Sequence, residues 1–180
     1  MPLTIAQLGQ PILRTKTKDV PPEEIPTPEF QQFVDEMLSL VDKEQGIGLA
    51  GPQVHSERRM FIAGVQPTES EEVAPGFEVF INPKLQPTSH TQLYSWEGCL
   101  SFRELLVLVP RFEAVQLEYW NRNGEAQSME LSGFPARVVQ HEFDHLEGIL
   151  TLDRAPSTQF IIKATELESA QKYLEERGKK

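Results

Sequence analysis

Apolar residues recur at helical spacing in the first quarter of the chain. The stripe consists of Phe30, Phe33, Val34, Met37, Leu38 and Val41. This spacing predicts an amphipathic helix that ends before Gly46. Thr27 is a suitable N-cap, and Pro28 fits the first turn because its missing N–H costs no helical hydrogen bond. The preceding residues, 20–30, are rich in proline and acid and indicate an extended loop.

From about residue 59 the pattern changes to short strands. The runs are rich in β-branched or aromatic residues, and they read MFIAGV, EVFINPKL, TQLYSW, LLVLVP, AVQLEYW and SMELSG. Proline, glycine and asparagine separate them, and the NRNG tetrapeptide at residues 121–124 is typical of a hairpin turn. This part of the chain therefore predicts antiparallel β structure with hairpins.

Helical patterns return towards the C-terminus. Ser132 and Gly133 begin a helix that runs through HEFDH, residues 141–145, and Gly148 stands where a helix-ending glycine belongs. An amphipathic stretch from about Ser157 to Glu176 predicts a last helix, with apolar positions at Phe160, Ile161, Ala164, Leu167 and Leu174. The order predicts an α+β fold, with antiparallel β-sheets packed around a central helix carrying HExxH, an N-terminal helix and a C-terminal helix.

Composition narrows the class of protein. The chain has 180 residues, of which 39% are hydrophobic, so we expect a single catalytic domain over residues 1–180. A net charge of −10 disfavours direct nucleic-acid binding, which depends on clustered Lys and Arg.

No apolar run approaches the roughly 20 residues that span a membrane, and residues 1–18 lack a signal-peptide pattern. We therefore expect a cytoplasmic location. The single cysteine, Cys99, excludes an intrachain disulfide and fits a reducing compartment.

The HEFDH motif predicts a metal site. Residues i and i+4 of a helix face the same way, so His141 and His145 present two imidazoles to one point, and Glu142 lies close enough to reach a metal-bound water. The alternative is a surface helix with accidental histidines. Only four histidines occur in the chain, however, and the motif is surrounded by apolar residues: Val138, Val139, Phe143, Leu146 and Ile149. Buried imidazoles need partners, which favours the metal.

The third ligand has several candidates. Glu147 follows His145 by only two residues and lies on a different face of the helix, while Glu166 and Glu168 belong to a polar face. Cys99, in WEGCLSF, is the better candidate because a thiolate is a strong ligand for zinc or iron. A lone buried cysteine acting as a small hydrophobe is the alternative.

Three motifs in this order resemble the signatures of one family. They are GIGLAGPQ at residues 46–53, EGCLS at 97–101 and QHEFDHLEG at 140–148. Together with the VPR triplet at 109–111, they are similar to the motifs of peptide deformylases. The resemblance implies a hydrolase that removes the N-terminal formyl group from formyl-methionyl nascent polypeptides and releases formate.

The resemblance also implies roles for individual residues. Glu142 would be the general base and then the general acid, while Gln53 and the backbone N–H of Leu100 would hold the developing oxyanion. The metal ligands would be Cys99, His141 and His145. Gly48 would bind the substrate chain through backbone hydrogen bonds. The methionine side chain would enter an apolar pocket lined by Ile47, Phe134, Val138 and the ring of His141. Glu97 would pair with Arg111 and brace the cysteine loop.

The implied cofactor is one divalent metal ion, with Fe(II) as the native metal and Zn(II) or Ni(II) as alternatives. The implied partners are formyl-methionyl peptides of nascent chains and a transient contact with the ribosome, with no membrane.

Two departures from the family pattern stand out. Gly51 replaces a frequent alanine, which predicts a looser loop, and Leu106 stands near a position where an arginine commonly contacts the substrate, with Arg103 displaced from it. The second departure puts peptide affinity in question.

Two other functions fit part of the pattern. An HExxH metalloprotease would cleave unformylated peptides, but it leaves Cys99 and Gln53 without a role. A non-catalytic relative would bind N-termini or metal without turnover, yet every motif keeps its reactive residues. Formate release from formyl-Met-Ala-Ser distinguishes the three functions.

Overall fold

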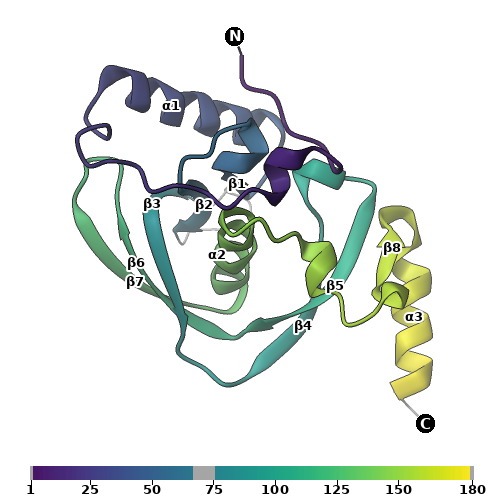
Figure 1. The fold of residues 1–180 in the computed structure, drawn as a ribbon. Coiled ribbons are helices and arrows are strands. Elements are labelled where there is room, and N and C mark those ends of the chain that lie inside the picture. The colour runs from purple at the N-terminus through teal and green to yellow at the C-terminus, as the bar shows by residue number, and fades with distance from the viewer. Residues whose placement is uncertain (1, 67–75, 179–180) are drawn as a thin grey trace.

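A computed structural model describes residues 2–66 and 76–178 and has the predicted α+β fold. Two antiparallel sheets lie on either side of helix α2, Gly133–Leu146, and helix α1, Pro28–Lys43, covers one end of the molecule (Figure 1). The last helix, α3, Leu167–Gly178, lies beside the smaller sheet and away from α1. Within the described ranges no helix is both long enough and apolar enough to span a membrane.

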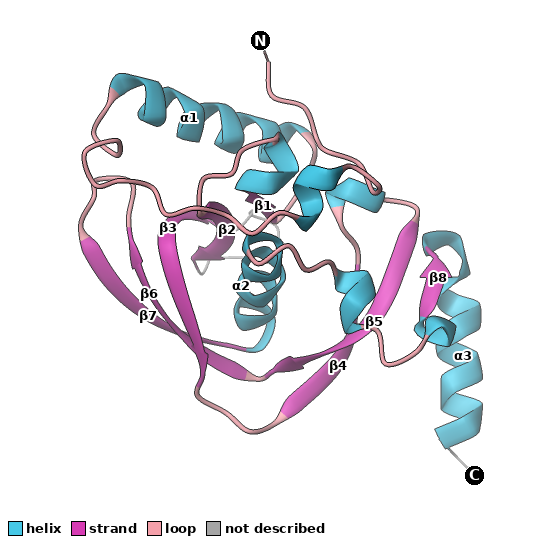
Figure 2. Cartoon of the chain, in the orientation of Figure 1, coloured by secondary structure: helices cyan, strands magenta, loops and turns pink. Residues whose placement is uncertain are grey.

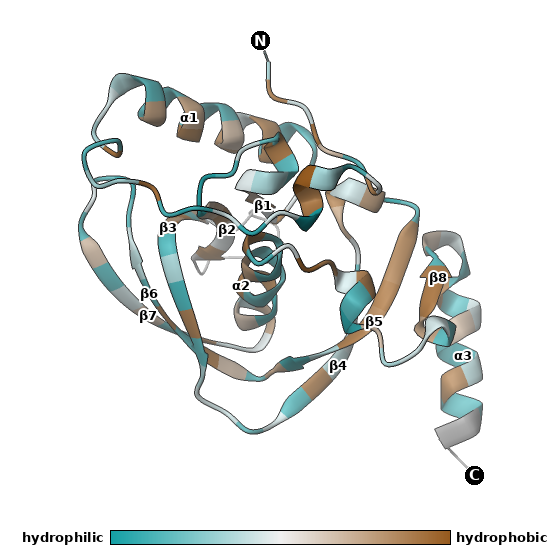
Figure 3. Cartoon of the chain, in the orientation of Figure 1, coloured by the Kyte–Doolittle hydropathy of each residue, from teal (hydrophilic) through white to brown (hydrophobic). Residues whose placement is uncertain are grey.

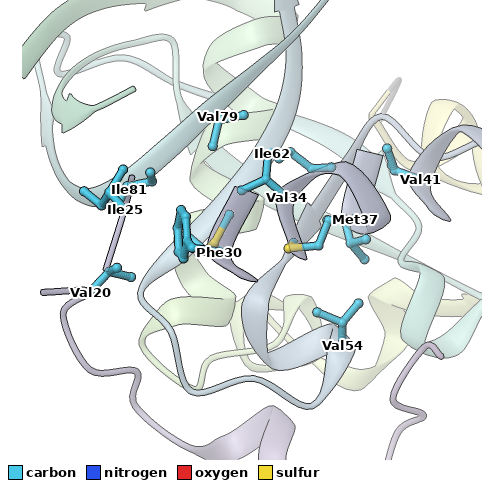
Figure 4. Close-up of a cluster of buried hydrophobic side chains, with 12 residues drawn as sticks. Val20, Ile25, Phe30, Val34, Met37, Val41, Val54, Ile62, Val79 and Ile81 are labelled. Atoms are coloured by element: carbon cyan, nitrogen blue, oxygen red, sulfur yellow. The ribbon is translucent and has the colours of Figure 1, made fainter. Parts of the chain in front are cut away.

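Helix α1 forms as its sequence predicts. The Thr27 side chain accepts a hydrogen bond from the backbone N–H of Phe30 at 3.3 Å, and Pro28 occupies the first turn. The buried face of the helix consists of Phe30, Val34, Met37 and Val41. These side chains pack with residues of the larger sheet into one hydrophobic cluster, shown in Figure 4. The burial of this face fixes α1 against the strands that carry the first glycine-rich motif.

The larger sheet has five strands in the order β1-β2-β3-β6-β7. Their bounds are Gly48–Ala50, Met60–Gln66, Gly76–Pro87, Ala114–Trp120 and Ala126–Ser132. The NRNG turn joins β6 to β7 as predicted, with Trp120 opposite Ala126 and Gly124 at a φ of 78°. The short edge strand β1 was not predicted, because GIGLAG has the composition of a turn.

The smaller sheet has the order β4-β5-β8, with β4 at Gln92–Glu97, β5 at Leu105–Phe112 and β8 at Ile161–Lys163. The prediction of one helix from about Ser157 to Glu176 is therefore wrong in its first half, and Figure 2 shows a strand there. Residues 161–163 pair with Leu105–Val107 and complete the sheet, and regular helix begins only at Leu167. Both β5 and β8 are hydrophobic (Figure 3). Pairing with a distant strand outweighs the local helical spacing.

Helix α2 is held on both sides. Ala136, Val138, Val139 and Leu146 belong to the same hydrophobic cluster as Phe61, Phe80 and Leu117 of the larger sheet. The helix ends as predicted at Gly148, which has a φ of 71° and donates its N–H to the carbonyl of His145. A Cβ at position 148 would lie 2.6 Å from the Arg14 carbonyl oxygen, so only glycine fits. The HEFDH segment is thus part of a helix enclosed by sheet.

Candidate metal centre and active site

Three candidate ligands meet at one point. Cys99 lies two residues after the end of β4, and His141 and His145 lie one turn apart on α2. Their ligand atoms all lie within 4.8 Å of one another, and the Cys99 Sγ is 3.4 Å from the His145 Nε2. The structure brings Glu147 to Lys16 and Arg59 instead, in two ion pairs. Glu166 and Glu168 belong to the C-terminal segment and do not join the group.

The donor set fits a divalent metal ion. Cys99 and His145 are buried, as is Glu142 beside them. Within the described residues, the buried Glu142 Oε2 and His145 Nδ1 have no hydrogen-bond partner, which is costly for polar atoms away from water. One thiolate and two imidazoles suit zinc or ferrous iron, and three protein ligands leave a position open for substrate or water.

Glu142 sits directly over β1. A Cβ at Gly48 would lie 2.3 Å from the Glu142 Oε1, so a glycine at this position is what allows the carboxyl group to occupy its place. Burial raises the pKa of Glu142 to about 7, with His141 and Arg111 acting in the opposite direction. A carboxyl group with this pKa can both accept and donate a proton near neutral pH.

Gln53 is buried in the 3-10 turn Gly51–Val54 and has a defined orientation. The backbone N–H of Ala50 donates to its Oε1 at 2.9 Å, so the amide oxygen is the acceptor on that side. The amide nitrogen therefore faces the candidate ligand Cys99, 3.5 Å from its Sγ, and lies 3.4 Å from the Ser101 Oγ. The side chain therefore presents its N–H donors to the site.

Glu97 and Arg111 form the predicted pair. Arg111 donates to both Glu97 oxygens, at 3.1 and 3.0 Å, and the His141 Nδ1 lies 3.0 Å from the Glu97 Oε2. Burial alone would raise the pKa of Glu97, but the hydrogen bonds from His141 and Arg111 lower it to about 2. Glu97 bonds to the Nδ1 of His141, so the Nε2 is the ring nitrogen left to face Cys99 and a metal ion.

The two histidines differ in their pKa shifts. Burial lowers the pKa of His141, but hydrogen bonds to Cys99 and Glu97 outweigh it and raise the pKa well above the ordinary value. Burial lowers the pKa of His145 well below the ordinary value, and the neighbouring His141 adds to the effect. His145 is therefore a neutral imidazole, the form that binds a metal.

The sequence analysis missed three charged residues of this network. Arg111 also donates to the Asp144 Oδ2 at 2.5 Å, and Arg154 donates to the Asp144 Oδ1 at 2.6 Å. Arg137 donates to the Glu97 Oε1 at 2.7 Å. A helical-spacing signal existed for Arg137, which precedes His141 by four residues and so shares its face of α2.

A cavity of about 420 Å³ lies against these groups. Its lining includes Gln53, Cys99, Leu100, His141 and Glu142 together with all four predicted substrate-contacting residues: Ile47, Gly48, Phe134 and Val138. Ile47 and Phe134 are 41% and 58% exposed, which puts them at the mouth. Ser95 and Trp96 of β4 also line the cavity and were not predicted.

The two departures from the family pattern have structural outcomes. The expectation of a looser loop at Gly51 is wrong, because a Cβ there would lie 2.5 Å from the carbonyl oxygen of Arg58. Arg103, not Leu106, lines the cavity, and its guanidinium pairs with Glu44. An arginine is thus present at the rim of the cavity, although it comes from a different position of the chain.

Comparisons with known proteins agree with the motifs. The family model described as polypeptide deformylase matches residues 2–160. The chain is 43% identical over 157 residues to peptide deformylase 2 of Nostoc sp., an alignment that covers 86% of this chain and 87% of that protein. The fold resembles the crystal structure of peptide deformylase from Thermotoga maritima, with a TM-score of 0.78, 33% identity, and coverage of 87% of this chain and 99% of that one.

A second solved structure has a ligand. It is the Met-Ala-Ser-bound class I type b peptide deformylase from Acinetobacter baumannii, with a TM-score of 0.78, 34% identity, and coverage of 86% of this chain and 98% of that one. The family model, the relative and the two structures all agree with the family inferred from the three motifs. The chain belongs to the peptide deformylase family, whose members remove the N-terminal formyl group from nascent polypeptides.

Proposed function

We propose that this protein hydrolyses the formyl group from formyl-methionyl nascent polypeptides and releases formate. The observation that carries the proposal is that Cys99, His141 and His145 meet at one point, against a cavity whose lining includes Cys99, His141, Glu142 and Gln53. A linear formamide is small enough to approach this group of residues at the end of an extended peptide. Family membership supports the same reaction.

Cys99, His141 and His145 would hold one divalent metal ion. When bound, the ion supplies a Lewis acid that lowers the pKa of a water molecule to about 7. The protein's own contribution is a buried His145 whose lowered pKa favours the neutral ring, and a Glu97 that fixes the orientation of His141. His141, whose pKa is raised, would release its proton when the metal binds.

Glu142 would move the proton. Its carboxylate would take a proton from the attacking water and then deliver it to the leaving amine, which departs only when protonated. Its raised pKa, about 7, suits both steps at neutral pH. The glycine at position 48 leaves room for the Oε1, because a Cβ there would lie 2.3 Å from it.

Gln53 and the backbone N–H of Leu100 would stabilise the oxyanion that forms when water adds to the formyl carbon. A preorganised donor at such a position is worth about 3 to 4 kcal/mol of barrier. The contact from Ala50 to the Gln53 Oε1 holds the amide with its N–H groups towards the site, so little reorganisation is needed during the reaction.

Substrate selection would come from the cavity wall. Ile47, Phe134, Val138 and the His141 ring would surround the methionine side chain, an unbranched apolar group that fills such a pocket. Gly48 lies in β1, the edge strand of the five-stranded sheet, so its backbone groups can bond to an extended peptide as an added strand would.

The rival activity is cleavage of unformylated peptides by an HExxH metalloprotease. Incubation of the metal-loaded protein with formyl-Met-Ala-Ser, followed by measurement of formate and of free Met-Ala-Ser, separates the two activities. We expect equal amounts of both products and no cleavage of the tripeptide. Cleavage of internal peptide bonds without formate would establish the protease.

We further propose that Fe(II) is the native metal, with Zn(II) or Ni(II) able to take its place. A thiolate with two imidazoles suits each of these ions. Protein purified without oxygen should contain iron, and its activity should decay in air as Cys99 and the ferrous ion are oxidised. The zinc form should be slower and stable in air. Equal, air-insensitive rates for both forms would contradict iron as the native metal.

The substrate also suggests the partner and the compartment. We propose that residues 1–180 act as a single catalytic domain in the cytoplasm and contact the ribosome transiently as a nascent chain emerges. The net charge of −10 argues against direct contact with nucleic acid. Sedimentation of the Glu142→Ala variant with ribosomes that display formyl-methionyl chains, compared with ribosomes that display deformylated chains, tests this contact. A single calorimetric unfolding transition is expected of the domain.

A further inference from the structure

Arg137 is nearly buried but has no part in the reaction described above. It lies on α2 one turn before His141, and its side chain is 11% exposed. Its guanidinium contacts three separate groups. Nη1 donates to the Glu97 Oε1 at 2.7 Å and to the carbonyl of Val109 at 3.3 Å, and Nη2 donates to the carbonyl of Leu93 at 2.5 Å. Arg137 therefore joins α2 to both β4 and β5.

The Glu97 carboxylate is saturated by its partners. Oε1 accepts from Arg111 Nε and Arg137 Nη1, while Oε2 accepts from Arg111 Nη2 and faces His141 Nδ1. An ionised carboxylate has about four acceptor positions, so every one is used. The plane of this carboxylate, and with it the direction of the His141 ring, depends on both arginines.

The two arginines hold Glu97 against different parts of the protein. Arg111 binds Glu97 on one side and Asp144 of α2 on the other, and all three side chains are buried. Arg137 binds Glu97 and the backbone of β4 at Leu93. Two residues further along, Ser95 and Trp96 of β4 line the cavity, and Arg137 itself is part of the wall. A planar fork with five donors suits these simultaneous contacts, and a single ammonium group does not.

We propose that Arg137 is a positioning residue that acts through Glu97 to orient His141. Through its bond to the Leu93 carbonyl, Arg137 also holds β4, which forms part of the cavity wall. The inference rests on the proposed metal site. Loss of the guanidinium would remove one of the two donors to the Glu97 Oε1, and Arg111 would then be the only arginine that orients the carboxylate against the imidazole. Partners of ligating histidines typically affect metal affinity by about 10- to 100-fold, and Arg137, one contact further away, should lie at the lower limit.

The test compares Arg137→Met and Arg137→Lys with wild type and with Arg122→Met. Arg122 is a matched control, since it is a partly buried arginine that bonds Gln31 and Asp35 of α1 and lies outside the site. Each protein is loaded with Co(II), and the rate of cobalt loss to a chelator and the cobalt–thiolate absorption band are measured. For Arg137→Met we expect cobalt loss about 10-fold faster, a shifted band and a raised KM for formyl-Met-Ala-Ser. Arg122→Met should match wild type.

A double-mutant cycle with Glu97→Gln identifies the route of the effect. If Arg137 acts through Glu97, Arg137→Met should accelerate cobalt loss less than about twofold in the Glu97→Gln background. Full additivity, or wild-type cobalt loss in Arg137→Met, would overturn the proposal.

Should Arg137→Met fail to fold, Arg137→Lys provides the test, because lysine keeps the charge but cannot hold Glu97 and Leu93 together. Wild-type cobalt loss in that variant would overturn the proposal equally. Cobalt loss does not depend on turnover, so absence of formate release by wild type would refute the proposed function separately.

Discussion

Replacing Gly48 with alanine would test the placement of Glu142 without removing any polar group. The added Cβ would lie 2.3 Å from the Glu142 Oε1 and 2.7 Å from its Cδ, whereas ordinary contact begins at 3.4 Å. The carboxylate oxygen must therefore retreat by about 1 Å. Glu142 is a buried residue of α2 whose carboxyl group lies against β1, so it has little room to move without leaving the reacting atoms.

A misplacement of this size has a predictable cost. A catalytic group displaced by about 1 Å loses roughly 100-fold in rate, equivalent to about 2.7 kcal/mol of barrier. We expect kcat for formyl-Met-Ala-Ser to fall by about this factor in Gly48→Ala, with metal content unchanged because no ligand is touched. The assay is formate release at equal metal loading, accompanied by thermal unfolding.

Gly98→Ala provides the matched control. Gly98 also lines the cavity, and a Cβ there would lie 3.4 Å from the Leu106 Cδ2, an ordinary contact. Its activity should stay within about threefold of wild type. Unaltered kcat in Gly48→Ala would refute the reasoning, since it would show that the position of the Glu142 carboxylate does not limit the reaction. An equal loss in both variants would do the same.

Three further predictions concern single side chains. Glu142→Ala should keep its metal and lose about 10²- to 10⁴-fold in rate, and an empty site on metal analysis would show that Glu142 is a ligand or a structural group. Cys99→Ser should hold less metal after dialysis, because a hydroxyl is a weaker ligand than a thiolate; full occupancy with full activity would exclude Cys99 as a ligand. Burial raises the pKa of Glu147, but Lys16 and Arg59 outweigh it and lower the pKa below 4.5, so its ionised form stabilises the fold. The advantage of wild type over Glu147→Gln in urea unfolding should be complete above pH 4.5 and shrink as the pH falls below it, and a pH-independent difference would contradict this.

Local periodicity was enough to predict most of the fold. The apolar stripe from Phe30 to Val41 has the spacing of an amphipathic helix and of no other element. The strands from Met60 to Ser132 are separated by clear turn residues. Strand β8 was missed because Ile161 also fits a helical stripe, and only pairing with the distant segment Leu105–Val107 decides between helix and strand. Strand β1 was missed because its glycine, Gly48, gives the segment the composition of a turn, and the contact with Glu142 that requires a glycine there is not revealed by any local pattern.

The site was predictable where its spacing is local. His141 and His145 lie one helical turn apart, so their shared direction follows from helix geometry alone. Cys99 could be chosen over Glu147 only as the better of several ligands, and the structure separates them because Glu147 is engaged by Lys16 and Arg59. Arg137 was missed because a helical arginine usually faces solvent, and its partners on β4 and β5 meet it only after the sheet has formed.

The most direct test of the account is formate release. Metal-loaded wild-type protein, incubated with formyl-Met-Ala-Ser, should yield formate and intact Met-Ala-Ser in equal amounts, and Glu142→Ala with the same metal content should yield almost none. Formate release that survives in Glu142→Ala, or a wild-type protein that releases no formate and cleaves the unformylated peptide instead, would contradict the central claim.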